Sequence, residues 1–113
     1  MTKSVCVFCG SRDGSLPEFQ EVAVELGRSL AKAGINLVYG GGQVGLMGHL
    51  ARAALADGGH VTGIIPEFLN KREIRFDEVS LVVETKTLRD RIKKMEEHSD
   101  AFIVLPGGIG TLD

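Results

Sequence analysis

The stretch INLVYGGGQVGLMGHLARAALAD, residues 35–57, decides the fold class of this 113-residue chain. Its apolar start, residues 35–39, is typical of a buried strand, and apolar residues recur with helical spacing from Leu46 onward. The turn Gly40–Gly42 stands between the two elements. A strand joined to a helix by a short glycine-rich turn is the repeating unit of a parallel sheet. The stretch therefore predicts an α/β fold.

The same alternation of apolar runs and helical periodicity continues on both sides of this stretch, without a linker or an internal repeat. The predicted strands are residues 5–8, 35–39, 60–65, 79–83 and 101–105. The predicted helices run from the Ser15 cap to Gly34, from Leu46 to Asp57 and from the Thr87 cap to His98. The stripe expected to be buried in the first helix consists of Phe19, Val22, Ala23, Leu26 and Leu30. Together these elements predict a Rossmann-like, doubly wound parallel sheet in three α/β/α layers.

The run 101–105 is apolar throughout, so we expect a strand that is buried on both faces. The sequence ends at Asp113, directly after a glycine-rich turn, whereas each earlier predicted strand has further chain to cover the sheet. We therefore expect residues 1–113 to be the N-terminal part of a single Rossmann-like nucleotide-binding domain whose C-terminal part is missing.

The composition narrows the class of ligand. Hydrophobic residues make up 43% and charged residues 25%, which excludes a disordered, collagen-like or disulfide-rich chain. Thirteen Lys and Arg against fifteen Asp and Glu give a net charge of -2, and no long basic block is present. These charges argue against nucleic acid and membrane surfaces as partners and favour a small molecule. Without a long apolar segment or a signal-peptide pattern, a cytoplasmic protein is expected.

Cys6 and Cys9 have the C-x-x-C spacing of a redox pair or of half a zinc site. No second pair of Cys or His residues stands at ligand spacing, and Cys6 lies inside the apolar run 5–8 rather than at a helix start. We therefore expect both thiols to be reduced and part of the core. The three histidines, which share no metal-ligand spacing, are His49, His60 and His98.

Glycine-rich turns follow three predicted strands, at residues 10–14, 40–42 and 106–111. The carboxyl ends of parallel strands lie on one edge of the sheet, so the three turns can line one crevice. One such turn alone can serve only to make a tight corner, but three in one sheet favour a phosphate site made of backbone N–H groups. The predicted phosphate-binding residues are Gly10, Ser11, Gly41, Gly42, Gly107, Gly108, Gly110 and Thr111.

Gly40, Gly42 and Gly45 also match the G-x-G-x-x-G pattern of dinucleotide-binding proteins. That pattern normally follows the first strand and needs an acidic residue at the end of the next strand. Here the next predicted strand is residues 60–65, and Glu67 lies beyond its end. A Walker loop is excluded, because no Gly-Lys-Ser/Thr follows any of the turns. A dinucleotide-binding oxidoreductase is therefore one hypothesis for the function, but it gives the turn 106–111 no role.

Arg91 falls on the apolar face of the helix that follows the strand 79–83. That face consists of Leu88, Ile92 and Met95. Arg91 either extends its guanidinium to water along the edge of the core or serves a functional site. Arg89 and Lys93 lie on the other side of the helix and are expected to be solvated.

With these motifs the chain resembles the Lonely Guy family of cytokinin-activating phosphoribohydrolases, also labelled possible lysine decarboxylases. The matching blocks are residues 5–11, 37–42, 45–48, 63–66 and 106–111, in this order. The resemblance implies hydrolysis of the N-glycosidic bond of cytokinin riboside 5'-monophosphate, or of AMP, to free base and ribose 5-phosphate. It also implies that the reaction needs no metal and no organic cofactor, that Met47 contacts the substrate, and that the protein is a homodimer.

The family carries a catalytic Arg in a helix written M-H-E-R-K-x-x-M and a Glu in the motif P-G-G-x-G-T-x-x-E. Residues 88–95, LRDRIKKM, place Arg91 on the catalytic Arg and depart from the motif at four other positions. The motif Glu would be the residue after Asp113. In such chemistry a carboxylate stabilises the oxocarbenium-like sugar, and an Arg stabilises developing negative charge. The alternative is a non-catalytic carrier of a nucleotide or of molybdenum cofactor with a similar fold.

Overall fold

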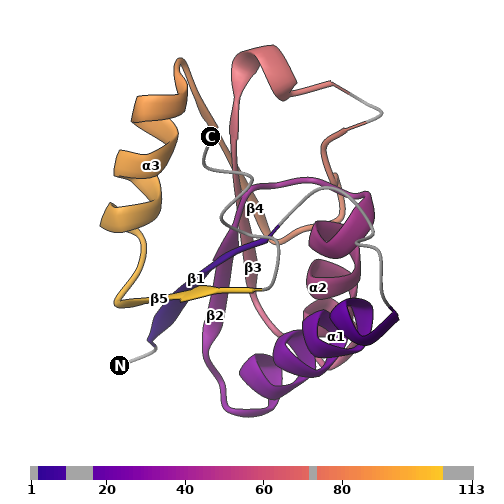
Figure 1. Ribbon diagram of the computed structural model, residues 1–113. Coiled ribbons are helices and arrows are strands. Elements are labelled where there is room, and N and C mark those ends of the chain that lie inside the picture. The colour runs from indigo at the N-terminus through magenta and orange to yellow at the C-terminus, as the bar shows by residue number, and fades with distance from the viewer. Residues whose placement is uncertain (1–2, 10–16, 72–73, 106–113) are drawn as a thin grey trace.

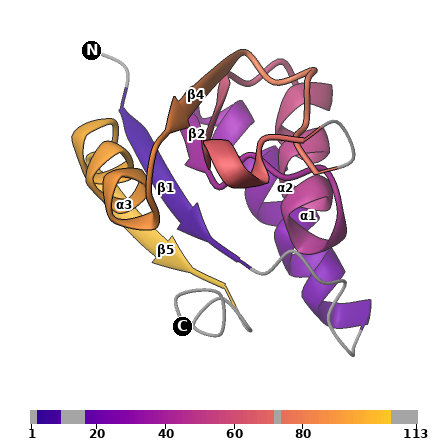
Figure 2. The ribbon, with the colours of Figure 1, turned by 90° about the horizontal axis from the view of Figure 1, so that it is seen from above.

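The computed structural model describes residues 3–9, 17–71 and 74–105. Its elements, in chain order, are β1 (Ser4–Phe8), α1 (Pro17–Lys32), β2 (Asn36–Tyr39), α2 (Gly45–Ala56), β3 (Val61–Pro66), the short 3₁₀ helix η1 (Glu67–Leu69), β4 (Leu81–Thr85), α3 (Leu88–Glu97) and β5 (Ala101–Val104). The five strands form one parallel sheet in the order β4-β3-β2-β1-β5. Helices α1 and α2 cover one face, and α3 lies on the other (Figures 1 and 2). The predicted parallel sheet in three layers is confirmed.

The strand β2 shows why the sheet sequences are apolar without alternation. Leu37 and Tyr39 belong to the larger apolar cluster, beneath α1 and α2. Val38, between them, belongs to the smaller cluster with Met95 of α3. Successive side chains of a strand point to opposite faces, so a strand covered on both sides needs apolar residues at every position.

The two cysteines lie on opposite faces of the sheet. Cys9 belongs to the larger cluster and Cys6 to the smaller one, and both are buried free thiols. Burial raises the pKa of Cys6 to about 11 and that of Cys9 to about 12, so both are neutral at pH 7. The structural interpretation of the C-x-x-C spacing is confirmed. Within the described ranges, no group of three or more His, Cys, Asp and Glu residues is placed to hold a metal ion.

The predicted boundaries lie within two residues of the observed ones for all five strands. The cap of α3 is confirmed, because the Thr87 side chain accepts a hydrogen bond from the Asp90 N–H at 3.0 Å. Ser15, the predicted cap of α1, lies outside the described residues. None of the helices that the structure describes is both long and apolar enough to cross a membrane.

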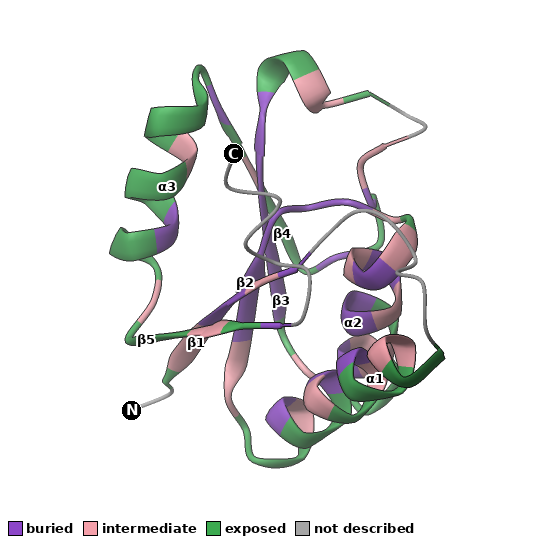
Figure 3. Ribbon diagram, in the orientation of Figure 1, coloured by how far each residue is buried: buried purple, intermediate pink, exposed green. Residues whose placement is uncertain are grey.

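Several positions expected to be buried are exposed. Figure 3 shows exposed residues along β5 and α1. Phe102 and Val104 of β5 are 47% and 50% exposed, so the prediction of a strand buried on both faces is wrong. In the described part of the chain β5 pairs only with β1, and α3 lies over β3 and β4 rather than over β5. Val22 of α1 is 42% exposed, because this helix packs mainly against α2 and buries a narrower stripe.

The order of the strands fixes the position of a site. β1 lies between β2 and β5, so the direction of the strand order reverses at β1. Ligands of open α/β sheets bind outside the carboxyl ends of the strands at such a reversal. The turn after β2, which contains the three consecutive glycines, adjoins that point.

Candidate functional site

Arg91 turns its guanidinium inward from the first turn of α3. Its Nε donates a hydrogen bond to the Ile64 carbonyl of β3 at 2.9 Å, and its Nη2 donates to the Gly40 carbonyl just after β2. No carboxylate among the described residues forms an ion pair with it. Burial lowers its pKa below the ordinary value. The guanidinium therefore does not extend into water along the edge of the core.

The rotation of α3 explains this placement. Arg91 and Met95, four residues apart, lie on the same face of the helix and turn toward the sheet. Leu88 and Ile92, by contrast, are 55% and 37% exposed, so the prediction that both lie on the buried face is wrong. Arg89 is exposed, as predicted. The buried face is narrower than the apolar pattern indicated, and Arg91 lies near its centre.

The glycines after β2 leave room for Arg91 and Met47. A Cβ atom on Gly40 would lie 2.5 Å from Nη2 of Arg91 and 2.8 Å from Cε of Met47. A Cβ atom on Gly42 would lie 3.0 Å from Sδ of Met47. The structure thus brings together four residues that the sequence singled out, namely Gly40, Gly42, Met47 and Arg91.

Residues 40–44, called the glycine loop below, are held through their carbonyl groups. The four donors are Nη2 of Arg91 to Gly40, the N–H of Phe76 to Gly41 at 2.9 Å, the hydroxyl of Tyr39 to Gly42 at 2.8 Å and Nη1 of Arg52 to Gln43 at 3.0 Å. The C=O and N–H of a trans peptide point in opposite directions, so fixed carbonyls also fix the N–H groups. Within the described residues the N–H groups of Gly41 and Gly42 have no hydrogen-bond partner.

Helix α2 begins directly after the glycine loop and lacks a side-chain cap. Its N-cap residue Val44 makes no capping hydrogen bond, and the first turn contains no acidic residue. A helix N-terminus of this kind presents N–H groups and a partial positive charge. In the described part of the chain, the Gly41 and Gly42 amides lack a partner, the start of α2 lacks a side-chain cap and Arg91 lacks a carboxylate partner. Together these features suit an anion such as phosphate.

The remaining predicted site residues, Gly10, Ser11, Gly107, Gly108, Gly110 and Thr111, lie outside the described residues. The strands β1 and β5, which precede these residues, are paired up to their ends, since the N–H of Leu105 donates to the Phe8 carbonyl at 2.9 Å. The carboxyl ends of β2, β1 and β5 are therefore adjacent.

Tyr39, Arg52 and Phe76 hold the glycine loop, but the sequence did not predict this role. One signal was present, because Arg52 and His49 are the two polar side chains in the otherwise apolar sequence of α2. The contact of Phe76 with the loop joins residues 35 positions apart and leaves no local pattern.

Tyr39→Phe is expected to lower the free energy of unfolding by about 1–3 kcal/mol, because the buried Gly42 carbonyl loses its donor. Burial raises the pKa of Tyr39, so the hydroxyl stays protonated and donates at physiological pH. Denaturant titration of the full-length protein measures the change, with Lys93→Gln on the exposed side of α3 as control. Equal stability of Tyr39→Phe and wild type would contradict the assignment.

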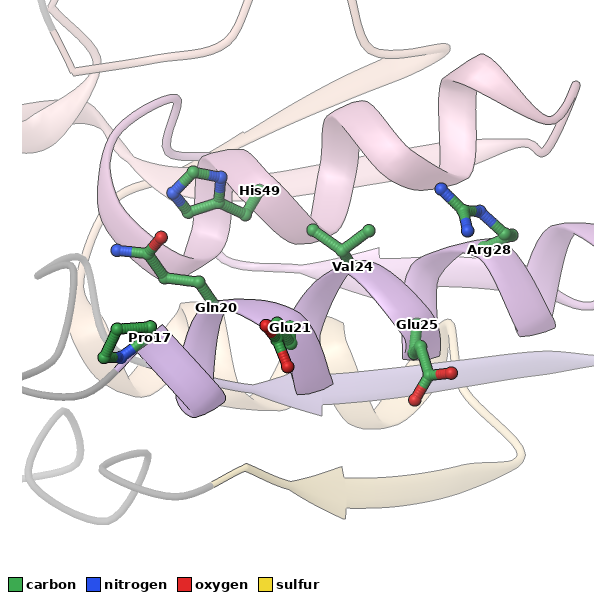
Figure 4. A pocket seen from close by; sticks show the side chains of 7 residues that line it. All are labelled: Pro17, Gln20, Glu21, Val24, Glu25, Arg28 and His49. Atoms are coloured by element: carbon green, nitrogen blue, oxygen red, sulfur yellow. The ribbon is translucent and has the colours of Figure 1, made fainter.

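A separate hollow lies between α1 and α2 (Figure 4). The described residues that line it are Pro17, Gln20, Glu21, Val24, Glu25, Arg28 and His49. Arg28 already approaches Asp57 at 3.6 Å. Since Met47, Arg91 and the glycine loop do not line this hollow, it is not part of the candidate site.

Comparison with known proteins identifies sequence relatives. A family profile described as possible lysine decarboxylase matches residues 47–113. The cytokinin riboside 5'-monophosphate phosphoribohydrolase LOG1 of Arabidopsis thaliana is 47% identical over 111 residues, which are 98% of this chain and 52% of the relative. The phosphoribohydrolase LOG7 of the same plant is 47% identical over 111 residues, with 98% and 51% covered. The chain thus spans about half the length of these relatives.

Among solved structures, the molybdenum cofactor binding protein from the phototrophic bacterium Rippkaea orientalis has a TM-score of 0.82 to this chain. The two are 26% identical, and the match covers 99% of this chain and 67% of that one. The Rossmann-type α/β fold is therefore shared.

Proposed function

Because the chain belongs to the family described as possible lysine decarboxylase, the Lonely Guy family, we propose that the full-length protein is a phosphoribohydrolase. It hydrolyses the N-glycosidic bond of cytokinin riboside 5'-monophosphate, or of AMP, to free base and ribose 5-phosphate. The observation that carries this proposal is Arg91, a partly buried cation that has no carboxylate partner among the described residues.

Arg91 is the proposed catalytic residue of this chain. A guanidinium has five N–H donors, of which two bind the Ile64 and Gly40 carbonyls. The others remain for the substrate. A partly buried cation that has no counter-ion among the described residues is costly, and a nucleotide brings the negative charge that offsets this cost. Arg91 then stabilises charge that develops on the phosphate or the departing base during cleavage.

The glycine loop and the start of α2 are the proposed phosphate site. The N–H groups of Gly41 and Gly42 lack partners in the described part of the chain, and α2 lacks a side-chain cap. Both features favour a bound phosphate. Met47 adjoins this loop and is the proposed apolar contact for the substrate. By their motifs, the proposal extends to Gly10, Ser11, Gly107, Gly108, Gly110 and Thr111.

Cleavage of a ribosyl bond develops positive charge on the sugar, and a carboxylate stabilises this charge and activates water. The family motif assigns that carboxylate to the position immediately after Asp113. Reading the next codon of the gene tests this part of the proposal. Glu is expected there, and a codon for a residue without a carboxylate would contradict it.

We also propose a cytoplasmic homodimer. Support for the cytoplasm comes from the free, buried thiols of Cys6 and Cys9, which suit a reducing compartment. Support for the dimer comes from the family resemblance. Light scattering of the full-length protein is expected to give twice the mass of one chain.

The direct test of the reaction uses full-length protein with AMP, isopentenyladenosine monophosphate and adenosine, and chromatography of the products. Free base and an equal amount of ribose 5-phosphate are expected from the two nucleotides, and far less base from adenosine. Adenosine lacks the phosphate and serves as the matched control. Nucleotide binding without release of base would contradict the proposal.

That contradicting result would favour a second candidate, a carrier that binds its ligand unchanged. The structural similarity to a molybdenum cofactor binding protein supports this candidate. Binding of molybdopterin together with failure to cleave either nucleotide would establish it.

A further inference from the structure

Arg52 approaches the glycine loop from α2. Helix α2 lies on the opposite face of the sheet from α3 (Figure 2). Its Nη1 donates to the Gln43 carbonyl at 3.0 Å. Its guanidinium carbon lies 5.9 Å from the centre of the Phe76 ring, within the range of a cation–π interaction. One side chain therefore joins the loop to a segment that follows β3.

The side chain of Arg52 lies where a positive charge is electrostatically unfavourable. The N-terminus of a helix carries a partial positive charge, which disfavours a second positive charge nearby. Arg52 nevertheless lies back along α2 toward that end, where Gly48 leaves space for it. A Cβ atom on Gly48 would lie 2.8 Å from Nη2 of Arg52. The aromatic ring and the Gln43 carbonyl compensate for the unfavourable location.

Residues 74–76, called the strap below, pair with the glycine loop through backbone hydrogen bonds. The N–H of Phe76 donates to the Gly41 carbonyl, and the N–H of Gln43 donates to the Ile74 carbonyl, both at 2.9 Å. Gly42 and Arg75 face each other as an isolated antiparallel bridge between these two bonds. The loop is thus paired like a short piece of sheet.

One chain of side-chain hydrogen bonds links the strap to β4. Arg75 donates through Nε to Asp77 at 2.6 Å and through Nη1 to Asn70 at 3.3 Å. Asn70 in turn donates to Glu84 of β4 at 2.5 Å. Asn70 thus connects the strap to β4, and Arg52 holds the Gln43 carbonyl beside the strap.

From this geometry we infer that Arg52 is a positioning residue for phosphate binding, an inference that rests on the proposed function. It fixes the Gln43–Val44 peptide beside the strap, and with it the Val44 N–H, so this end of the loop keeps one direction before a ligand arrives. Donors that are already oriented bind an anion without the cost of ordering the loop. Arg52 acts through the loop and does not itself need to touch the substrate.

The first test compares Arg52→Ala with wild type in the full-length protein. Hydrogen exchange of the peptide covering residues 40–46, without ligand, is expected to become about fivefold faster, since the loop loses one of its four external donors. The KM for AMP is expected to rise about tenfold while kcat changes less than twofold. Arg28→Ala, which removes an exposed Arg from α1, is the matched control and is expected to change neither quantity.

Two further variants separate positioning from charge. Arg52→Lys keeps the positive charge but loses the flat contact with Phe76, so its KM is expected to stay at least threefold above wild type. Phe76→Leu removes the ring and keeps the backbone N–H that binds Gly41. In a double-mutant cycle with Arg52→Ala, its effect on KM is expected to be less than additive.

Unchanged exchange of the loop in Arg52→Ala would overturn the inference, whatever the activity. Faster exchange with an unchanged KM would also overturn it, because Arg52 would then be only structural. Full recovery of KM by Arg52→Lys would assign the effect to charge alone and overturn positioning. If wild type releases no base, the proposed function fails, and Kd values for AMP replace KM in the same comparisons.

Discussion

Arg91→Lys is expected to lower kcat about 100-fold or more while the protein stays folded. The guanidinium of Arg91 holds the Ile64 and Gly40 carbonyls with two N–H groups and has further donors for a substrate. A Lys ammonium keeps the charge, but it cannot reproduce this planar set of donors. Steady-state kinetics and thermal melting of the full-length variant measure both quantities.

The control for this variant is Arg89→Ala, two residues earlier on the exposed side of α3. It removes a similar charge at a position without contact to the glycine loop, so activity and melting temperature are expected to stay near the wild-type values. Wild-type turnover in Arg91→Lys would show that Arg91 is only structural. Loss of turnover in Arg89→Ala would contradict the observed rotation of α3.

Gly41→Ala is expected to raise the KM for AMP more than tenfold and to leave the affinity for adenosine within about threefold. Gly41 has a φ of +82°, a conformation that costs an L-residue about 1–2 kcal/mol. The added Cβ would also lie 3.2 Å from Cβ of Ile65. A rotation of the loop peptides would relieve both the backbone strain and the close contact with Ile65. This rotation would move the N–H groups away from the phosphate, whereas adenosine has no phosphate to lose them.

Gly58→Ala is a closely matched control. Gly58 has a φ of +79°, and a Cβ there would meet no atom within 4 Å. It follows the other end of α2, about 18 Å along the helix axis from the glycine loop. Gly58→Ala is therefore expected to lose similar stability with an unchanged KM. Equal losses of affinity for AMP and adenosine in Gly41→Ala would indicate general misfolding and contradict a phosphate site.

The sequence was sufficient to predict the sheet, because each strand is a short apolar run between turn residues. It also identified Arg91, since a charge beside Met95 is unusual on a helix that packs on a sheet. It overestimated burial at Leu88, Ile92 and Phe102, which are apolar but partly exposed in the described chain. Apolar character predicts burial only where a partner element covers the position.

The partners of Arg91 could not be predicted, because Gly40 and Ile64 are 51 and 27 residues away in the sequence. Such contacts depend on the strand order and on the rotation of α3, and neither leaves a local pattern. The strap is a similar case, since the pairing of Gly42 with Arg75 follows from the path of the chain after β3. The glycine-rich turns predicted a candidate phosphate site, but not what holds the loop in place.

Arg91 and the glycine loop are proposed to bind a nucleoside 5'-monophosphate at the carboxyl edge of the sheet. A crystal structure of full-length Arg91→Lys with AMP tests it most directly, because slow turnover preserves the ligand. Phosphate oxygens are expected within about 3 Å of the Gly41 and Gly42 amides, with the ribose toward residue 91. A phosphate bound elsewhere, for example between α1 and α2, would contradict it.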